Sequence, residues 1–163
     1  MTDQSDPFAE LLAALVRTAH AERILEIGTG SGHSARAMTM ALPPQGLLIT
    51  IERDPARAAE ARRLLASLSP PGRTSVMVGD AARFLHKVAG PFDLIVQDSD
   101  PATYTAMHDR LVRLLRIRGL LVTRVAPEAQ DYNEKLAADG RLQTDYVPAG
   151  EGTRVAISLK RQD

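Results

Sequence analysis

Short, almost continuously apolar runs alternate with helix-like stretches along this chain, and no other feature constrains its fold as strongly. The apolar runs are Arg23–Ile27, Leu47–Ile51, Thr74–Val78, Phe92–Gln97 and Gly119–Val125. Strands buried on both faces of a parallel sheet have this character, because neither of their faces meets water. Alternating strands and helices therefore predict an α/β fold with right-handed crossovers and helices on both faces of the sheet.

The stretches between these runs are rich in Ala, Arg and Leu, which favour helices. They cover Ala35–Leu42, Pro55–Leu68, Ala81–Val88, Pro101–Arg116 and Pro127–Ala138, and another helix is expected at about Asp6–His20. Asp-Pro pairs that begin at Asp6, Asp54 and Asp100 place a capping acceptor before a proline suited to the first helical position. Asp80 is expected to cap the following helix in the same way.

The end of the chain follows a different pattern from the rest. Two strand-like runs, Arg141–Val147 and Thr153–Lys160, are joined by Pro-Ala-Gly-Glu-Gly. No helix fits between them, so they are expected to form an antiparallel hairpin. We therefore predict a single domain over residues 1–163, with a doubly wound, mostly parallel sheet closed by this hairpin.

Composition excludes several classes of protein. Acidic and basic residues both number 20, and this zero net charge disfavours a broadly basic nucleic-acid-binding protein. Cysteine is absent, which excludes disulfides, thiolate metal sites and cysteine nucleophiles. No apolar stretch approaches the roughly 18 residues that a membrane span needs. The first ten residues lack the basic start and apolar core of a signal peptide, so a cytoplasmic location without a membrane partner is expected.

A glycine-rich loop joins the first apolar run to a helix, in the segment Glu26-Ile27-Gly28-Thr29-Gly30-Ser31-Gly32-His33-Ser34. Glycines let the backbone turn tightly and approach a ligand, and the helix start offers N–H groups to an anion. Glu52 ends the next run, where a carboxylate can accept hydrogen bonds from ribose hydroxyls. The spacing departs from the dinucleotide pattern G-x-G-x-x-G, since position 33 is His. A purely structural strand–turn–helix remains the alternative.

The spacing acid-x-G-x-G-x-G resembles motif I of class I S-adenosylmethionine (SAM)-dependent methyltransferases. The segments LEIGTGSGHSARAM, ITIERDP, VMVGDAARFL, FDLIVQDSDPATY and LLRIRGLLVT follow in the order seen in the catechol and caffeoyl-CoA type O-methyltransferase family. The tail YNEKLAADGRLQTDYVPAGEGTRVAI is also similar to the C-terminal end of that family. The resemblance implies a Rossmann-like, seven-stranded sheet whose last strand is antiparallel, and SAM as the cofactor.

The resemblance also implies a set of cofactor-binding residues. They are Glu26, Gly28, Gly30, Gly32, His33, Ser34, Glu52, Arg53, Asp80, Ala81 and Asp98. The loop residues would cradle the methionine part of SAM, and those at the helix start would lie near its carboxylate. Glu52 would bind the ribose with Arg53 beside the adenine, while Asp80 and Ala81 would meet the adenine edge. Simpler roles stay open, such as a helix cap for Asp80 and a solvated side chain for Arg53.

The residues that hold a metal ion in this family are the ones from which this chain departs. There, the acid matching Asp98 binds a divalent cation together with an Asp-Asn pair, and that pair aligns here with Arg124 and Val125. An arginine cannot bind a cation and a valine has no donor atom. The lysine of the family motif D-x-D-K-x-x-Y is replaced by Pro101. We therefore expect no catalytic metal.

The function expected from these observations is metal-independent methyl transfer from SAM, most simply O-methyl transfer, to a small-molecule acceptor that the sequence does not identify. Asp98 is the expected catalytic residue. Asp100, Tyr104 and His108 are the other candidates for a proton acceptor. The alternative is a non-catalytic SAM-binding protein derived from a methyltransferase. Whether the chain forms a homodimer is left open.

A repeated arginine raises the question of nucleic-acid binding. Arg110, Arg113 and Arg116 recur every three residues, with Arg118 and Arg124 nearby. Such a stripe can bind phosphates, but a solvated helix face is the simpler interpretation at zero net charge.

Overall fold

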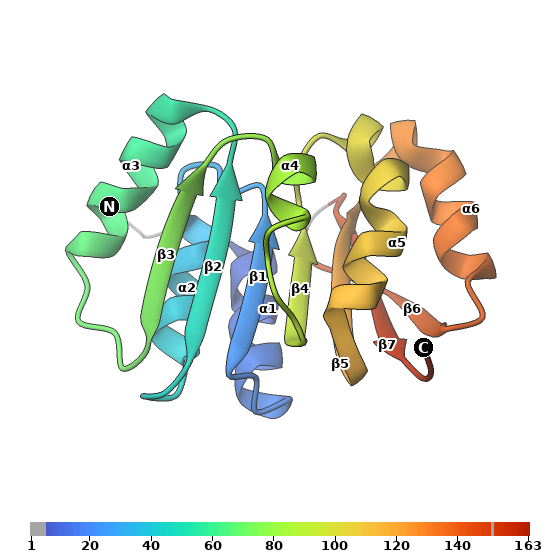
Figure 1. Cartoon of the computed structure of the whole chain (residues 1–163), viewed down its shortest axis with the longest axis horizontal. Helices are drawn as coiled ribbons and strands as arrows, with labels where there is room; N and C mark the ends of the chain where they lie inside the picture. Colours follow the sequence, from blue (N-terminus) through green and yellow to red (C-terminus); the bar gives the residue numbers. More distant parts are fainter. Residues whose placement is uncertain (1–5, 151) are drawn as a thin grey trace.

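The computed structural model describes residues 6–150 and 152–163, which form a seven-stranded sheet with helices on both sides (Figure 1). The strands are β1 (Arg23–Ile27), β2 (Leu47–Glu52), β3 (Arg73–Val78), β4 (Phe92–Gln97), β5 (Leu115–Val125), β6 (Leu142–Pro148) and β7 (Arg154–Lys160). Their order is β3-β2-β1-β4-β5-β7-β6. Strand β7 runs antiparallel to β5 and β6, and the remaining pairs are parallel. The expected Rossmann-like sheet with a closing hairpin is confirmed.

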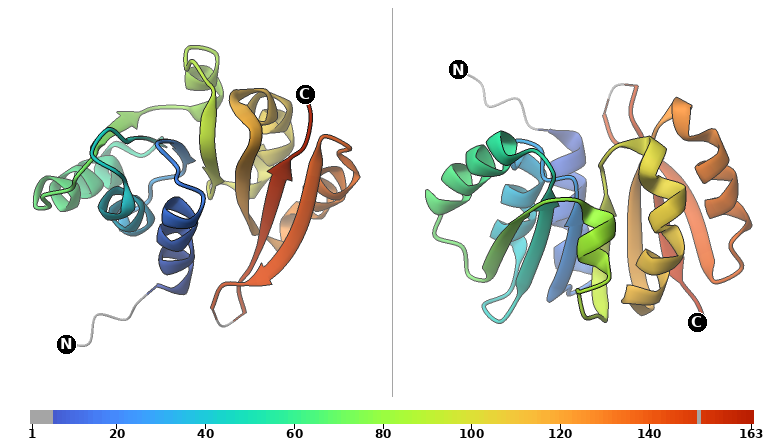
Figure 2. Two further views of the ribbon diagram at one scale, coloured as in Figure 1. Left: turned by 90° about the horizontal axis from the view of Figure 1, so that it is seen from below. Right: turned by 45° about the horizontal axis from the view of Figure 1, so that its top comes forward.

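Helices cover both faces of this sheet (Figure 2). They are α1 (Pro7–Thr18), α2 (His33–Ala41) and α3 (Pro55–Ala66) on one face, and α4 (Ala81–Leu85), α5 (Tyr104–Leu114) and α6 (Gln130–Ala138) on the other. Short 3₁₀ turns, η1 (Pro101–Thr103) and η2 (Pro127–Ala129), precede α5 and α6. Asp6, Asp54, Asp80 and Asp100 each accept a hydrogen bond from a first-turn N–H, so all four predicted caps are confirmed.

Two apolar cores lie on opposite faces of the sheet, and β1 contributes to both. Ile24 packs in the core beneath α1 and α2, where Phe8 is the largest side chain. The next residue, Leu25, packs in the core beneath α5 and α6 with Tyr104 and Tyr132. Successive side chains of a strand point to opposite faces. A strand covered on both sides is therefore continuously apolar, as the sequence indicates.

Most predicted helices are a few residues shorter in the structure, and α5 and α4 show why. The stretch expected to be helical to Arg116 ends at Leu114, because Leu115 already pairs with Phe92 and begins β5. The stretch expected to continue to Val88 ends at Leu85, where the chain tightens into a turn. Sheet pairing therefore ends α5, whereas α4 ends in a turn before β4 begins at Phe92.

The glycines of the loop after β1 have different structural roles. Gly28 has a φ of +93°, and a Cβ there would lie 2.3 Å from the carbonyl oxygen of Asp98. The loops after β1 and β4 therefore touch backbone to backbone. At Gly30, with a φ of +54°, a Cβ would meet nothing within 4 Å. Gly32 packs closely on α3, where a Cβ would lie 3.0 Å from that of Ala61.

This difference predicts unequal costs for two alanine substitutions in the same loop. Gly28→Ala combines a strained φ with backbone overlap and should lower the free energy of unfolding by about 3 kcal/mol or more. Gly30→Ala adds only the strain of a positive φ, about 1 kcal/mol. Urea unfolding followed by circular dichroism measures both. Equal losses for the two variants would show that the Gly28 contact is not tight.

Candidate functional site

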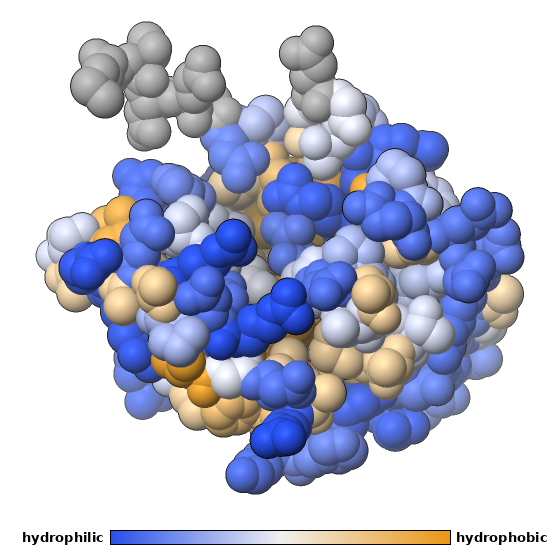
Figure 3. Space-filling model, turned by 90° about the horizontal axis from the view of Figure 1, so that it is seen from above, coloured by the Kyte–Doolittle hydropathy of each residue, from blue (hydrophilic) through white to orange (hydrophobic). Residues whose placement is uncertain are grey.

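A cavity of about 550 Å³ opens at the carboxyl ends of β1, β2 and β4, beside the glycine loop. Figure 3 views this face of the molecule, which is hollowed near its middle. The volume lies within the range of small-molecule sites, and in doubly wound sheets ligands bind at this edge.

Most residues predicted to bind the cofactor line this cavity. They are Gly28, Gly30, His33, Ser34, Glu52, Arg53, Asp80, Ala81 and Asp98. The two that do not are Glu26, which is fully buried beneath the loop, and Gly32, which is part of the loop but packs against α3. The structure thus brings together side chains that follow four different strands.

Glu26 is fully buried beneath the glycine loop and supports it through hydrogen bonds. Its carboxylate accepts hydrogen bonds from the hydroxyls of Ser34 and Thr50, both at 2.5 Å. Thr50 in turn shares a 2.5 Å hydrogen bond with Thr29 of the loop. Burial raises the pKa of Glu26 to about 7, although these hydroxyls oppose the shift. Glu26 therefore links β1, β2 and α2 and makes no direct contact with the cavity.

Glu52 also holds the glycine loop, but from the cavity side. Its Oε2 accepts from the backbone N–H of Gly30 at 2.7 Å, and its Oε1 accepts from that of Asp54 at 2.9 Å. Each carboxylate oxygen has a second lone pair, so hydroxyls of a ligand can still bind there.

Helix α2 begins at the cavity without a side-chain cap. Gly32 is the N-cap residue and offers no side-chain acceptor to the first turn. The side chain of the first helical residue, His33, instead shares a 2.8 Å hydrogen bond with Ser31. First-turn N–H groups of a helix carry partial positive charge, and they suit an anionic ligand group such as a carboxylate.

Arg53, Asp80 and Ala81 lie around another part of the cavity. The Oδ1 of Asp80 accepts from the N–H of Arg83 at 3.1 Å, so this residue both caps α4 and lines the cavity. Arg53 is exposed and lies 3.6 Å from Asp100, a separation at which an exposed ion pair contributes little.

Asp98 and Arg124 form a two-point ion pair at one end of the cavity. The Nε of Arg124 donates to Oδ1 of Asp98 at 2.7 Å, and Nη2 donates to Oδ2 at 3.0 Å. Burial raises the pKa of Asp98, and Arg124 opposes that shift. The divalent metal implied by the family resemblance does not fit this arrangement, because a guanidinium already engages both carboxylate oxygens.

The other candidate proton acceptors are not placed equally well. Asp100 lines the cavity, but it caps η1 by accepting from Ala102. Tyr104 is buried outside the cavity lining, and burial raises the pKa of its hydroxyl above the ordinary value. His108 is wholly buried and also lies outside the lining. Of these side chains, only Asp98 and Asp100 can meet a ligand in the cavity.

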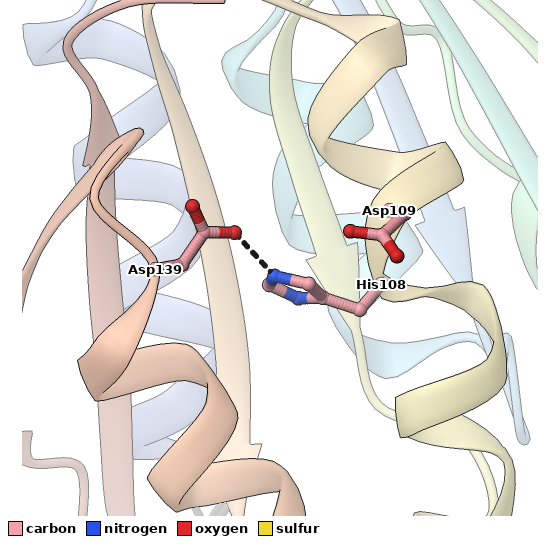
Figure 4. A group of neighbouring side chains, drawn as sticks. All are labelled: His108, Asp109 and Asp139. Atoms are coloured by element: carbon pink, nitrogen blue, oxygen red, sulfur yellow. Dashed lines mark hydrogen bonds and ion pairs between the residues drawn. The ribbon is translucent and has the colours of Figure 1, made fainter.

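His108 belongs to a separate cluster with Asp109 and Asp139 (Figure 4). Its Nε2 lies 2.7 Å from Oδ2 of Asp139. The ligand atoms of the three residues lie within 4.8 Å of one another, a spacing that a metal ion could bridge. However, Arg141 donates to both carboxylates, at 2.6 Å to Asp139 and 2.8 Å to Asp109. We therefore interpret the cluster as a cross-link between α5 and the segment after α6.

Two of the arginines near α5 are bound within the chain. Arg110 donates to the carbonyls of Leu85 and Val88, and Arg116 pairs with Asp93. The solvated helix face expected from the sequence is therefore wrong for Arg110, which fastens α5 to the α4 segment.

Several cavity residues could not be identified from the sequence. Asp6, Ser99, Thr103 and Met107 line it beside the predicted set. The Oγ of Ser99 is buried and has no hydrogen-bond partner among the described residues. The sequence marks Asp6 only as a helix cap and gives no ligand-binding signal for the other three. These residues reach the cavity only because α1 and the β4–α5 connection pack at the sheet edge.

A family model for O-methyltransferases matches residues 2–127. This chain belongs to the O-methyltransferase family. It is 33% identical over 153 residues to a catechol O-methyltransferase of Niastella koreensis. That alignment covers 90% of this chain and 63% of the relative. It is 29% identical over 172 residues to catechol O-methyltransferase domain-containing protein 1 of Mus musculus, covering 93% of this chain and 66% of the relative. The chain thus spans slightly less than two thirds of these relatives.

A solved structure shows the same architecture. It is an O-methyltransferase from Streptomyces achromogenes involved in tomaymycin synthesis, in complex with SAM. The TM-score is 0.85 at 26% identity, and the match covers 97% of this chain and 81% of the other. The methyltransferase form of the α/β fold inferred from the sequence is therefore confirmed.

The raised pKa of Glu26 predicts how stability depends on pH. The pKa of Glu26 is about 7 in the folded protein, against 4.5 for an unperturbed glutamate. The folded state therefore binds the carboxyl proton of Glu26 more tightly than the unfolded chain does. Its contribution to stability is complete below about pH 4.5 and is lost as the pH rises to about 7. Glu26→Gln cannot ionise, so it should gain about 3 kcal/mol relative to wild type across that window.

Urea unfolding at several pH values measures this difference. The exposed Glu60 of α3 offers a matched control, and Glu60→Gln should track wild type at every pH. If Glu26→Gln and wild type kept a constant difference from pH 4.5 to 7, folding would not raise the pKa of Glu26.

Proposed function

We propose that this protein is a SAM-dependent O-methyltransferase that acts on a small molecule and needs no divalent metal at Asp98. The observation that carries the proposal is the placement of Glu52, the uncapped start of α2 and Asp98 around one cavity at the sheet edge. These groups complement the ribose, the carboxylate and the amine of SAM in turn. Membership of the O-methyltransferase family supports the same activity.

The residues present fit SAM by charge and by hydrogen-bonding capacity. Glu52 would accept from the ribose hydroxyls, and Asp98 would face the cofactor amine. The N–H groups at the start of α2 would bind the carboxylate, with the side chains of His33 and Ser34 close by. Asp80 and Ala81 would bind the adenine edge, with Arg53 at the rim. Glu26 would act indirectly by fixing the loop through Ser34 and Thr50.

When bound, SAM supplies an electrophilic methyl group on a positively charged sulfur. The task of the protein is then mainly alignment, with the acceptor oxygen held about 3 Å from the methyl carbon and opposite the sulfur. The nearby Asp98 carboxylate also favours a positive charge at this end of the cavity. Its paired Arg124 offsets the charge of Asp98, and the carboxylate of Asp6 lies close enough to act on both groups.

A non-catalytic SAM-binding protein is the second candidate. The observation that favours it is the same ion pair, since Arg124 replaces groups that would bind a metal and leaves Asp98 with both oxygens engaged. Cofactor binding without turnover would follow from that arrangement.

Location and partners remain predictions from the sequence. Among the residues that the structure describes, no helix has the length and apolarity required to cross a membrane. From the sequence alone we predict a cytoplasmic location and a small-molecule acceptor. Whether the chain forms a homodimer stays open.

Methyl transfer can be tested with tritiated SAM and a pool of hydroxylated and acidic small molecules, with and without chelator. We expect methylated product at an unchanged rate in the presence of chelator, because the Arg124 guanidinium takes the place that a divalent cation would need at Asp98. Activity that chelator abolishes and magnesium restores would refute the metal-independent part. Binding of SAM with no product from any acceptor would favour the non-catalytic candidate.

Cofactor binding itself can be tested by calorimetry with S-adenosylhomocysteine (SAH). Glu52→Gln keeps an acceptor for the Gly30 N–H but loses the charge, and it should weaken binding by about 10- to 100-fold. Glu60→Gln, on the exposed side of α3, should bind as wild type does. Equal affinities for the two variants would mean that Glu52 does not bind the ribose.

A further inference from the structure

Arg124 is held rigidly at the reacting end of the cavity. It lies near the end of β5, one position beyond the Gln97–Thr123 pair that closes the β4–β5 register, so it lies beside Asp98. Its guanidinium lies 4.1 Å from the centre of the Phe8 ring, and Phe8 is wholly buried. A guanidinium that is bonded along one edge and stacked on an aromatic face has little freedom to move.

The same guanidinium keeps hydrogen-bonding capacity on its other edge. Of its five N–H donors, Nε uses one and Nη2 uses one, both on Asp98. No hydrogen bond of Nη1 occurs within the described part of the chain, and the side chain retains about a third of its exposure at the cavity. Arg141 shows in this chain that one guanidinium can bridge two oxygen acids, since it binds both Asp139 and Asp109.

From this geometry we propose that Arg124 binds the methyl acceptor, and that the acceptor carries an oxygen acid already ionised at neutral pH, such as a carboxylate or an acidic phenol. The Nη1 edge would hold one oxygen of that acid beside Asp98. Arg124 is then the residue that sets acceptor specificity. The proposal rests on the methyltransferase function proposed above.

The chemistry balances without a base, a metal or another reactant. A lone pair of the ionised acceptor oxygen forms the new bond to the methyl carbon. The bond from carbon to sulfur breaks, and its electron pair stays on sulfur, which becomes the neutral thioether of SAH. The acceptor passes from an anion to a neutral ester or ether, and no proton is released. A neutral catechol, in contrast, must lose a proton, and Asp98 is already committed to Arg124.

The test uses the full chain saturated with SAH, with benzoate as the acidic probe and benzamide as its neutral counterpart. Calorimetry should show benzoate binding at least about tenfold more tightly than benzamide, as expected for a charge-assisted hydrogen bond. Arg124→Met should abolish that preference. Arg124→Lys keeps the charge without the planar donors, so it should retain the preference with weaker binding. Arg36→Met removes the same charge from an exposed position outside the cavity and should bind benzoate as wild type does.

The outcomes separate this proposal from the one on which it rests. Equal binding of benzoate and benzamide by wild type, or unchanged benzoate binding in Arg124→Met, would overturn the role of Arg124 even if SAH binds. Failure of wild type to bind SAH would instead overturn the methyltransferase function. The comparison of the two probes on wild type needs no variant, so it decides the question even if an Arg124 variant fails to fold. In the transfer assay, product from carboxylic acids or acidic phenols supports the proposal, and product from neutral catechols alone contradicts it.

Discussion

The cavity depends on one close contact, in which the backbone at Gly28 lies against the backbone of Asp98 and Ser99. This contact fixes the loop after β1 against the loop after β4. It therefore sets the distance between the groups that would hold an amino-acid carboxylate and those at the reacting end. No residue with a side chain fits there, because a Cβ would overlap the Asp98 carbonyl. The hydrogen bond from Gly28 N to the Ile51 carbonyl, at 2.9 Å, adds the third strand to the same junction.

A second layer of polar side chains supports this junction from below. Glu26 is buried with Ser34 and Thr50 as its partners, and Glu52 holds Gly30 from above. Burying a carboxyl group is costly, and these hydrogen bonds only partly offset the cost for Glu26. The loop thus gains a fixed shape at the expense of some stability, which is a common trade at ligand-binding sites.

At the reacting end, an arginine lies where the family resemblance places ligands of a metal ion. A divalent cation and a guanidinium both neutralise Asp98, but they differ in what else they can do. A cation draws a proton from a bound hydroxyl by lowering its pKa. A guanidinium offers only directed N–H donors, and it binds best an oxygen that already carries charge. The exchange of one for the other therefore favours a change in the acceptor rather than a simple loss of function.

The sequence by itself determined the element order, the helix caps, the hairpin and many of the residues that line the cavity. These features are local, since capping acids, glycine spacing and runs of apolar residues act within a few positions of the chain. Only the tertiary structure decided that Arg124 pairs with Asp98 and stacks on Phe8, because those residues meet through strand register and helix packing. It also separated His108 and Tyr104 from the cavity and ended α5 at Leu114, where pairing with β4 outweighs helix propensity. Long-range packing of this kind leaves no periodic signal in the sequence.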